Sequence, residues 1–286
     1  MGTYENCYDI IADVRRDVNE YSEAYVQGAD DTGAWSNELI TQKINLSQFY
    51  LYNILFQRNP QHLYRKQVQL TAVDSVFTLP ADFAKLEWFK DDQGTPVRKI
   101  PIGDLTPRGV SELMYYQQGN TLVLEKSGST KTYTLIYRWM PRRIFAGKSF
   151  AGAATSITFA KPASKLADYY NGMIIENITK DWVDTITDYS TARVATIAET
   201  AAANDYFGLV SELPIPFHHL IAPKASMLLR ASSPLAQNKV TKDEQGMFQE
   251  DLTETLLAYG GENDDQDLAE VFNDFDIGNP VLGIVV

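Results

Sequence analysis

Two adjacent histidines, His218 and His219, are the residues whose chemistry would best suit a metal ion. Neighbouring residues on a helix diverge by about 100°, and no cysteine or cluster of carboxylates lies beside the pair in the sequence. A protein metal site needs three or four converging ligands. We therefore predict no metal site, and we expect one histidine to be packed and the other solvated.

A second candidate for ion binding is the acidic run from Asn263 to Asp267, which superficially resembles the start of a calcium loop. With Asn263 at the first position, Leu268 occupies the position of the invariant glycine and Asp274 that of the bidentate glutamate. The match fails where the geometry of such a loop is strictest. We interpret the run as an acidic, solvated linker.

The other reactive groups follow no catalytic pattern. Cys7 falls on the apolar side of a predicted helix, where it would pack as a small hydrophobe. Asp74 and Asp82 flank a short predicted strand near Pro80, where turn-forming carboxylates are ordinary. The sequence contains no glycine-rich phosphate loop, nucleophile elbow or His-Glu-x-x-His helix. We assign no catalytic or cofactor-binding residue and predict that the protein is not an enzyme and has no cofactor.

Aromatic side chains gather in a region predicted to form a sheet, and exposed rings there would suit a sugar. Cross-strand packing explains the same residues and is the more common cause of such a pattern. A carbohydrate-binding or glycan-cleaving protein remains an alternative. The residues concerned are Trp88, Phe89, Tyr115, Tyr116, Tyr133, Tyr137 and Trp139.

Two helices are predicted at the start of the chain. From Tyr4, apolar residues recur at steps of three and four, which predicts a helix of about six turns that reaches Tyr25. Ser36 is a good N-cap for a second helix, which continues to about Arg58, before Pro60. Apolar residues surround much of this second helix. We expect it to pack on two sides, and another chain is one candidate for the second side.

Strands follow in two groups. Alternating apolar residues and turn signals predict a first antiparallel sheet or small sandwich, and a second strand-rich module comes after it. The small-residue stretch Ala146–Ala154 is interpreted as the segment that separates them. The predicted strands are 68–72, 76–79, 86–89, the hairpin 115–124 and 133–139 in the first group, and 157–159, 173–178, 183–189 and 194–197 in the second.

Helical periodicity returns near the end of the chain. Pro223 must lie in the first turn of its helix or kink it, and Thr241 with Glu244 forms a capping box for the last helix. The order of elements predicts an α+β fold: a bundle of N- and C-terminal helices with antiparallel β-sandwich insertions. The predicted parts are an N-terminal helical platform (1–66), a β domain (67–145), a second β module (146–210), C-terminal helices that complete the platform (211–261) and a tail (262–286).

Composition excludes some classes of protein. The 286 residues include 37 acidic and 25 basic ones, for a net charge of −12, which disfavours a surface built to grip nucleic-acid phosphates. No apolar run approaches the ~20 residues of a membrane span, and residues 1–10 are too polar for a signal peptide. We expect no membrane partner and no sequence-specific nucleic-acid partner.

Several short motifs follow one another in an order that is typical of one family. They are Trp35–Ile40, Ile44-Asn45, Leu79–Phe83, Gln118–Leu124, Tyr133–Arg138, Leu213–Pro216 and Leu220-Ile221. In order and spacing they resemble the head-to-tail adaptor proteins of tailed bacteriophages. Residues 156–197 are similar instead to a small β module of other phage virion proteins, which the simplest adaptors lack.

The resemblance implies a structural virion protein at the portal–tail junction, made in the host cytoplasm. It implies a homo-oligomeric ring, usually dodecameric, that docks to the portal protein and presents a platform to the next tail or nozzle component. Genome DNA would pass through such a ring. The alternatives are another virion ring or tail-hub protein, and a carbohydrate-binding tail protein.

The last residues of the chain are the predicted partner-binding site. They are too apolar for a free tail and would add a strand to a partner's sheet edge or fill its groove, unless they fold back on their own domain. The predicted residues are Phe272, Phe275, Ile277, Asn279, Pro280, Val281, Leu282, Ile284, Val285 and Val286.

The excess negative charge lies in the same closing part of the chain. From Asp243 to Val286 there are twelve acidic residues and no Lys or Arg, so the rest of the chain is formally neutral. This segment would either meet a basic partner surface, with charge steering the encounter, or face a DNA channel and repel passing DNA. The sequence leaves both uses open.

Overall fold

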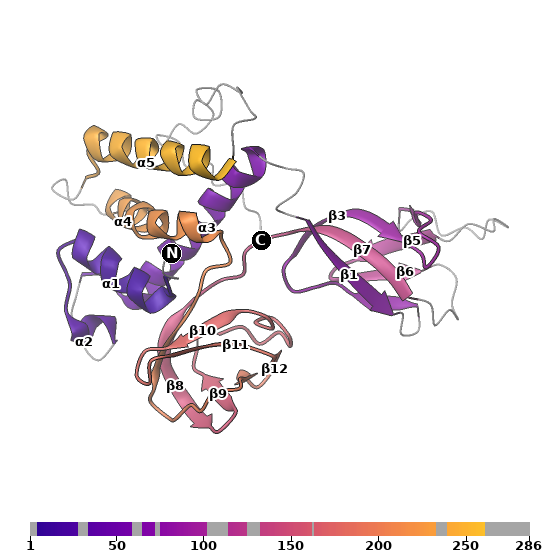
Figure 1. Ribbon diagram of the computed structural model, residues 1–286, viewed down its shortest axis with the longest axis horizontal. Coiled ribbons are helices and arrows are strands. Elements are labelled where there is room, and N and C mark those ends of the chain that lie inside the picture. Colours follow the sequence, from indigo (N-terminus) through magenta and orange to yellow (C-terminus); the bar gives the residue numbers. More distant parts are fainter. Residues whose placement is uncertain are drawn as a thin grey trace. The chain divides into compact units, whose positions relative to one another are not determined.

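The structure is a computed structural model that describes residues 5–27, 34–58, 65–71, 75–101, 114–124, 132–161, 163–232 and 239–260. The chain forms two compact units: Met1–Asn59 with Leu213–Val286, and Pro60–Glu212. The described helices belong to the first unit and the described strands to the second (Figure 1). The predicted α+β class is confirmed.

The helical unit draws on both ends of the chain. α1, α3 and α4 pack on one another, and η2, a 3₁₀ helix, contacts both α4 and α5. The elements are α1 (Cys7–Asp17), α2 (Glu23–Val26), α3 (Asn37–Arg58), η2 (Ile215–Leu220), α4 (Ile221–Ala231) and α5 (Lys242–Gly260).

The first helix is shorter than predicted. α1 ends at Asp17, and Asn19 adopts a left-handed backbone conformation with φ of 57°. The N–H of Glu20 then donates to the carbonyl of Arg15 at 2.8 Å, which closes the end of the helix. Asparagine tolerates this conformation better than most residues. The spacing of apolar residues predicts one long helix because α2, a separate helix that begins at Glu23, continues a similar spacing after α1 has ended.

The second helix was predicted correctly. α3 begins at Asn37, where the Ser36 hydroxyl accepts a hydrogen bond from the N–H of Leu39 at 3.2 Å, and it ends at Arg58. Both α1 and α4 of the same chain pack against it, so its broad apolar surface serves two intrachain contacts. Leu46 is an exposed apolar residue of this helix.

The closing α-helices begin at Ile221 and Lys242. Pro223 is the third residue of α4 and therefore lies in its first turn. Before α5, the N–H of Thr241 donates to Glu244 Oε2 at 2.8 Å and the N–H of Glu244 donates to Thr241 Oγ1 at 3.2 Å. The capping box is confirmed.

The first β module consists of two sheets. One has the strand order β1-β7-β3 and the other β2-β6-β5-β4; the β4–β5 pair is parallel and the other pairs are antiparallel. The strands are β1 (Arg65–Thr71), β2 (Val76–Thr78), β3 (Phe83–Lys90), β4 (Arg98–Lys99), β5 (Met114–Gln118), β6 (Thr121–Leu124) and β7 (Thr132–Trp139).

Aromatic rings fill the core of this module. Phe77, Phe89, Tyr115 and Tyr133 come from strands of both sheets, and their ring centroids lie 5.1–5.4 Å apart in contacting pairs. Such pairs are worth about 0.5–1.5 kcal/mol beyond the area that they bury. Packing between the strands therefore accounts for Phe89, Tyr115 and Tyr133 among the aromatic residues of the predicted sheet.

The second β module is one sheet of seven strands in the order β11-β10-β14-β8-β9-β13-β12. Its two outermost strands, β11 and β12, are joined by only two residues, Ile186 and Thr187, so the sheet must curl until its ends approach each other (Figure 1). The strands are β8 (Ala146–Ala153), β9 (Ser156–Phe159), β10 (Ile174–Asn177), β11 (Trp182–Thr185), β12 (Asp188–Tyr189), β13 (Val194–Thr196) and β14 (Tyr206–Leu209).

Two predictions about this module were wrong, and one of its strands was not predicted. The stretch Ala146–Ala154, interpreted as a separator, is largely the long strand β8. Gly152 of this strand has a packing reason, because a Cβ there would lie 2.7 Å from main-chain atoms of Ala201 and Ala202. The strand predicted over 183–189 is two strands, β11 and β12, and β14 was not predicted.

Candidate functional site

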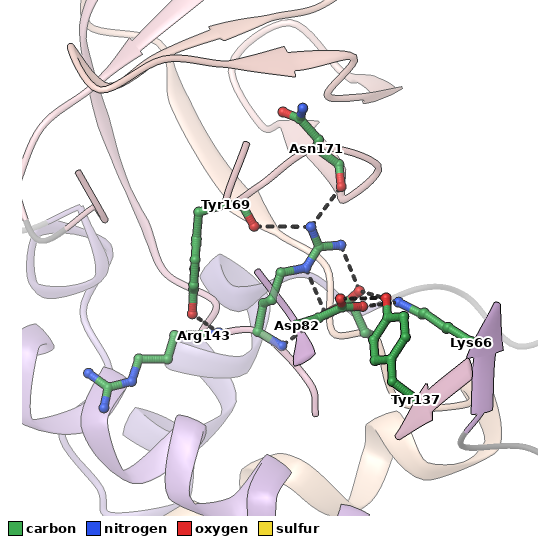
Figure 2. A network of polar contacts seen from close by, with 8 residues as sticks. Lys66, Asp82, Tyr137, Arg143, Tyr169 and Asn171 are labelled. Atoms are coloured by element: carbon green, nitrogen blue, oxygen red, sulfur yellow. Dashed lines mark hydrogen bonds and ion pairs between the residues drawn. The ribbon is translucent and has the colours of Figure 1, made fainter. Parts of the chain in front are cut away.

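A polar network lies where the chain enters and leaves the second β module (Figure 2). Arg142 stands between β7 and β8, and Glu212 follows β14. The Arg142 guanidinium donates from Nε to Glu212 Oε2 at 3.0 Å and from Nη2 to Oε1 at 2.7 Å, and its main-chain N–H donates to Oε2 at 2.8 Å. This bidentate pair joins the two ends of the module.

The remaining guanidinium nitrogen of Arg142 holds a loop of the same module. Nη1 donates to the carbonyl of Tyr169 at 3.0 Å and to that of Asn171 at 2.7 Å. Burial alone would lower the pKa of Arg142, but hydrogen bonds and charge from Glu212 outweigh burial and raise it. The arginine thus remains a buried cation with every side-chain nitrogen in a hydrogen bond.

Residues of the first β module also take part in this network. Lys66 on β1 forms an ion pair with Asp82 and lies 3.7 Å from Glu212 Oε1. The Tyr137 hydroxyl on β7 donates to Asp82 Oδ1 at 2.9 Å, and burial together with the Asp82 charge raises the pKa of Tyr137. Glu212 is therefore shared between Arg142 and Lys66, and it connects both β modules.

The chemistry of this network is that of a structural clamp. Each carboxylate faces a cation at close range, and the tyrosine is held as a neutral donor. In the part of the chain that the structure describes, no three His, Cys, Asp or Glu side chains gather as a metal site requires. Removing one partner of such a buried pair is strongly destabilising. We call the five residues of this network the clamp: Lys66, Asp82, Tyr137, Arg142 and Glu212.

The family model described as SU10 adaptor protein matches residues 5–173, which is more than half of the chain. The chain belongs to this family. It is thus a phage adaptor, a structural kind of protein and a virion component, and the predicted resemblance is confirmed at that level. No curated protein matches the chain.

The matched residues of the adaptor run from α1 to the loop before β10. They include four of the five clamp residues; Glu212 lies beyond the match. None of the described helices combines the length and apolarity that crossing a membrane requires.

The adaptor places its two adjacent histidines as predicted. His218 is buried, with Nε2 at 2.8 Å from the carbonyl of Leu213, and Nδ1 accepts from the N–H of Glu5 at 3.4 Å. His219 is exposed and lies 3.3 Å from Asp251. The buried ring thus connects the first described residue of the chain to η2, which is a packing role.

Cys7 is fully buried, as predicted, and burial raises the pKa of its thiol. Such a thiol is a poor nucleophile because the thiolate is the reactive form.

Other predicted residues of the adaptor lie outside the described residues. These are Asp74, the acidic run 263–267 and the partner-binding residues 272–286. Among the seven aromatic residues weighed for sugar binding, Trp88 is 50 % exposed, whereas the buried ones are Phe89, Tyr115, Tyr133, Tyr137 and Trp139. Among these seven residues there is therefore no row of exposed rings that would suit a sugar.

Proposed function

We propose that this phage adaptor forms a ring that docks to the portal protein and presents a platform to the next tail or nozzle component. Membership of the adaptor family is the observation that carries the proposal. In this account the platform is a bundle of N- and C-terminal helices, and the two β modules are insertions that face neighbouring proteins. The ring is dodecameric, as is usual in the family that the sequence resembles.

The distribution of charge supports an assembly role for the helical unit. The residues of this unit include 21 acidic and 8 basic ones, whereas the β unit has 16 acidic and 17 basic ones. The helical unit therefore has a formal charge of 8 − 21 = −13 and the β unit one of 17 − 16 = +1, so the negative charge of the chain belongs to the helical unit. Such a unit would be steered towards a basic partner surface, or would keep passing DNA from adhering.

The clamp, which lies in the β unit, also supports the proposal. A ring under a packaged genome must keep its parts in register, and the clamp ties both β modules to one shared carboxylate. The second module, residues 146–210, is then free to present its outer surface to a neighbour.

In this proposal the C-terminal residues 272–286 bind the portal. The test is a chain that lacks Asn279–Val286, mixed with purified portal protein and sedimented with it. We expect the shortened chain to keep the far-ultraviolet circular dichroism of the full chain and to lose co-sedimentation. A matched control replaces Val183, an exposed apolar residue of β11, by Ser. Co-sedimentation of the shortened chain at the level of this control would refute the docking role of the tail.

A further inference from the structure

The three-stranded sheet β1-β7-β3 has one buried and one open face. Alternate residues of β7, from Tyr133 to Trp139, lie on the inner face of the sheet and are buried. The residues between them pair with outward residues on both sides: Thr134 with Gln69 and Lys90, Ile136 with Gln67 and Trp88, and Arg138 with Arg65 and Lys85. We call these nine residues the outer face.

The outer face is basic and has an exposed indole, that of Trp88, in its middle row on the edge strand β3. Glu87 neutralises part of the charge because it forms ion pairs with Arg65 and Arg138. Lys85 has no acidic partner among the described residues, and Lys90 Nζ lies 5.5 Å from the centre of the Trp88 ring. A half-exposed tryptophan between two lysines suits a partner surface that has an apolar side chain between two acidic ones.

α5 carries the complementary pattern. Met247 is 70 % exposed, and Asp243 and Glu250, four residues before it and three after it, are exposed on the same side of the helix. Neither acid has a cationic partner among the described residues. We call these three residues the α5 patch.

We propose that the α5 patch of one copy of this chain docks on the outer face of a second copy. Met247 then lies on the Trp88 ring, a favourable contact between sulfur and an aromatic ring. Asp243 and Glu250 face Lys85 and Lys90. This inference rests on the self-association that the proposed function includes, and it names the two surfaces that meet.

The dimensions of the two surfaces agree. The rows that contain Lys85 and Lys90 are four residues apart on β7, which is about 13 Å along a strand. Asp243 and Glu250 are seven residues apart, which is about 10 Å along a helix. Lysine and glutamate side chains easily span the difference, and the apolar residue lies between the charges on both surfaces.

The test is a disulfide between chains. Full-length Trp88→Cys chains are mixed with full-length Met247→Cys chains under mild oxidation; the natural Cys7 is fully buried and stays silent. We expect a covalent dimer that contains one chain of each kind. The control mixes Met247→Cys with Phe150→Cys, a position that is highly exposed on the second β module. Cross-linking no faster than in this control would overturn the proposal.

Exchange of the charges gives an independent readout. Lys85→Glu with Lys90→Glu in one chain, or Asp243→Lys with Glu250→Lys in another, should each weaken self-association about tenfold in sedimentation experiments. A mixture of the two variants should restore it, because each contact then joins opposite charges again. Lys161→Glu with Lys165→Glu, both exposed on the second β module, is the control. If the mixture of the two variants associates no more tightly than either variant alone, the proposal is overturned.

The proposed function is tested separately by co-sedimentation of the wild-type chain with the portal. Docking to the portal without the cross-link would overturn the Trp88–Met247 contact and leave the proposed function intact. A cross-link without docking would support the contact and contradict the role at the portal.

Discussion

Arg142 and Glu212 are 70 residues apart in the sequence, yet the guanidinium of one holds both carboxylate oxygens of the other. They stand at the two points where the chain enters and leaves the second β module. The pair thus links the two ends of that module to each other, as a disulfide links the two ends of a loop. Lys66 extends the contact to the first module.

Loss of the Glu212 charge should weaken the whole β unit. We expect Glu212→Gln to lower the free energy of unfolding by about 3 kcal/mol, because Arg142 would remain buried without its counter-ion. Urea titration followed by tryptophan fluorescence measures the change. Glu199→Gln, at an exposed position, is the control, and an equal effect of both changes would show that the clamp adds no stability.

Gly152 should not tolerate a side chain. A Cβ there would lie 2.7 Å from main-chain atoms of Ala201 and Ala202, so Gly152→Ala should cost about 1–3 kcal/mol through overpacking. Gly147 lies in the same strand with no atom within 4 Å of a Cβ, which makes Gly147→Ala a matched control. Thermal unfolding of the two variants compares them. Equal melting temperatures would mean that the close approach to 201–202 is absent.

The end of α1 should depend on the residue at position 19. Asn19 has φ of 57°, a conformation that costs a β-branched residue about 1–2 kcal/mol more. Asn19→Val should therefore destabilise the helical unit by about that amount, and Asn19→Gly should leave its stability nearly unchanged. Denaturation followed by circular dichroism distinguishes the two. A continuous helix from Tyr4 to Tyr25 would give the opposite order, because valine is the better helix former.

Lys224 should make stability depend on pH in the alkaline range. It is buried, its Nζ lies 3.8 Å from the centre of the Tyr50 ring, and burial lowers its pKa to about 8. Because the pKa is lower in the folded than in the unfolded chain, the penalty is complete below pH 8 and disappears as pH rises towards the unfolded value.

Replacement of Lys224 by methionine should therefore stabilise the helical unit by up to about 3 kcal/mol at pH 7. The gain should shrink between pH 8 and pH 10. Lys242→Met, at an exposed position on α5, should show no such pH dependence. Unfolding titrations of both variants at pH 7 and pH 10 make the comparison, and a gain from Lys224→Met that is the same at both pH values would refute the account.

The elements of this adaptor were predictable where local patterns determine them. α3 and α5 carry complete capping signals at Ser36 and Thr241, and the hairpin around Gly119 and the strand β7 alternate cleanly. The end of α1 was not predicted because the left-handed conformation at Asn19 does not interrupt the regular spacing of apolar residues along the sequence. β8 was missed because small residues lack the usual strand signal.

The clamp was beyond the reach of the sequence. Lys66 lies on β1, whereas Asp82, Arg142 and Glu212 lie in three separate connecting segments, and nothing in their spacing along the chain indicates that they meet. Asp82 lies in a turn, as the sequence predicts, but its contacts with Lys66 and Tyr137 depend on the fold. Long-range ion pairs have no sequence period, so only the fold identifies them.

Electron cryomicroscopy of the portal region of the virion tests the central claim most directly. The account predicts a ring of this chain between the portal and the first tail component, with the C-terminal residues in contact with the portal. Density for this chain in tail fibres or at the distal hub, and none beneath the portal, would contradict it.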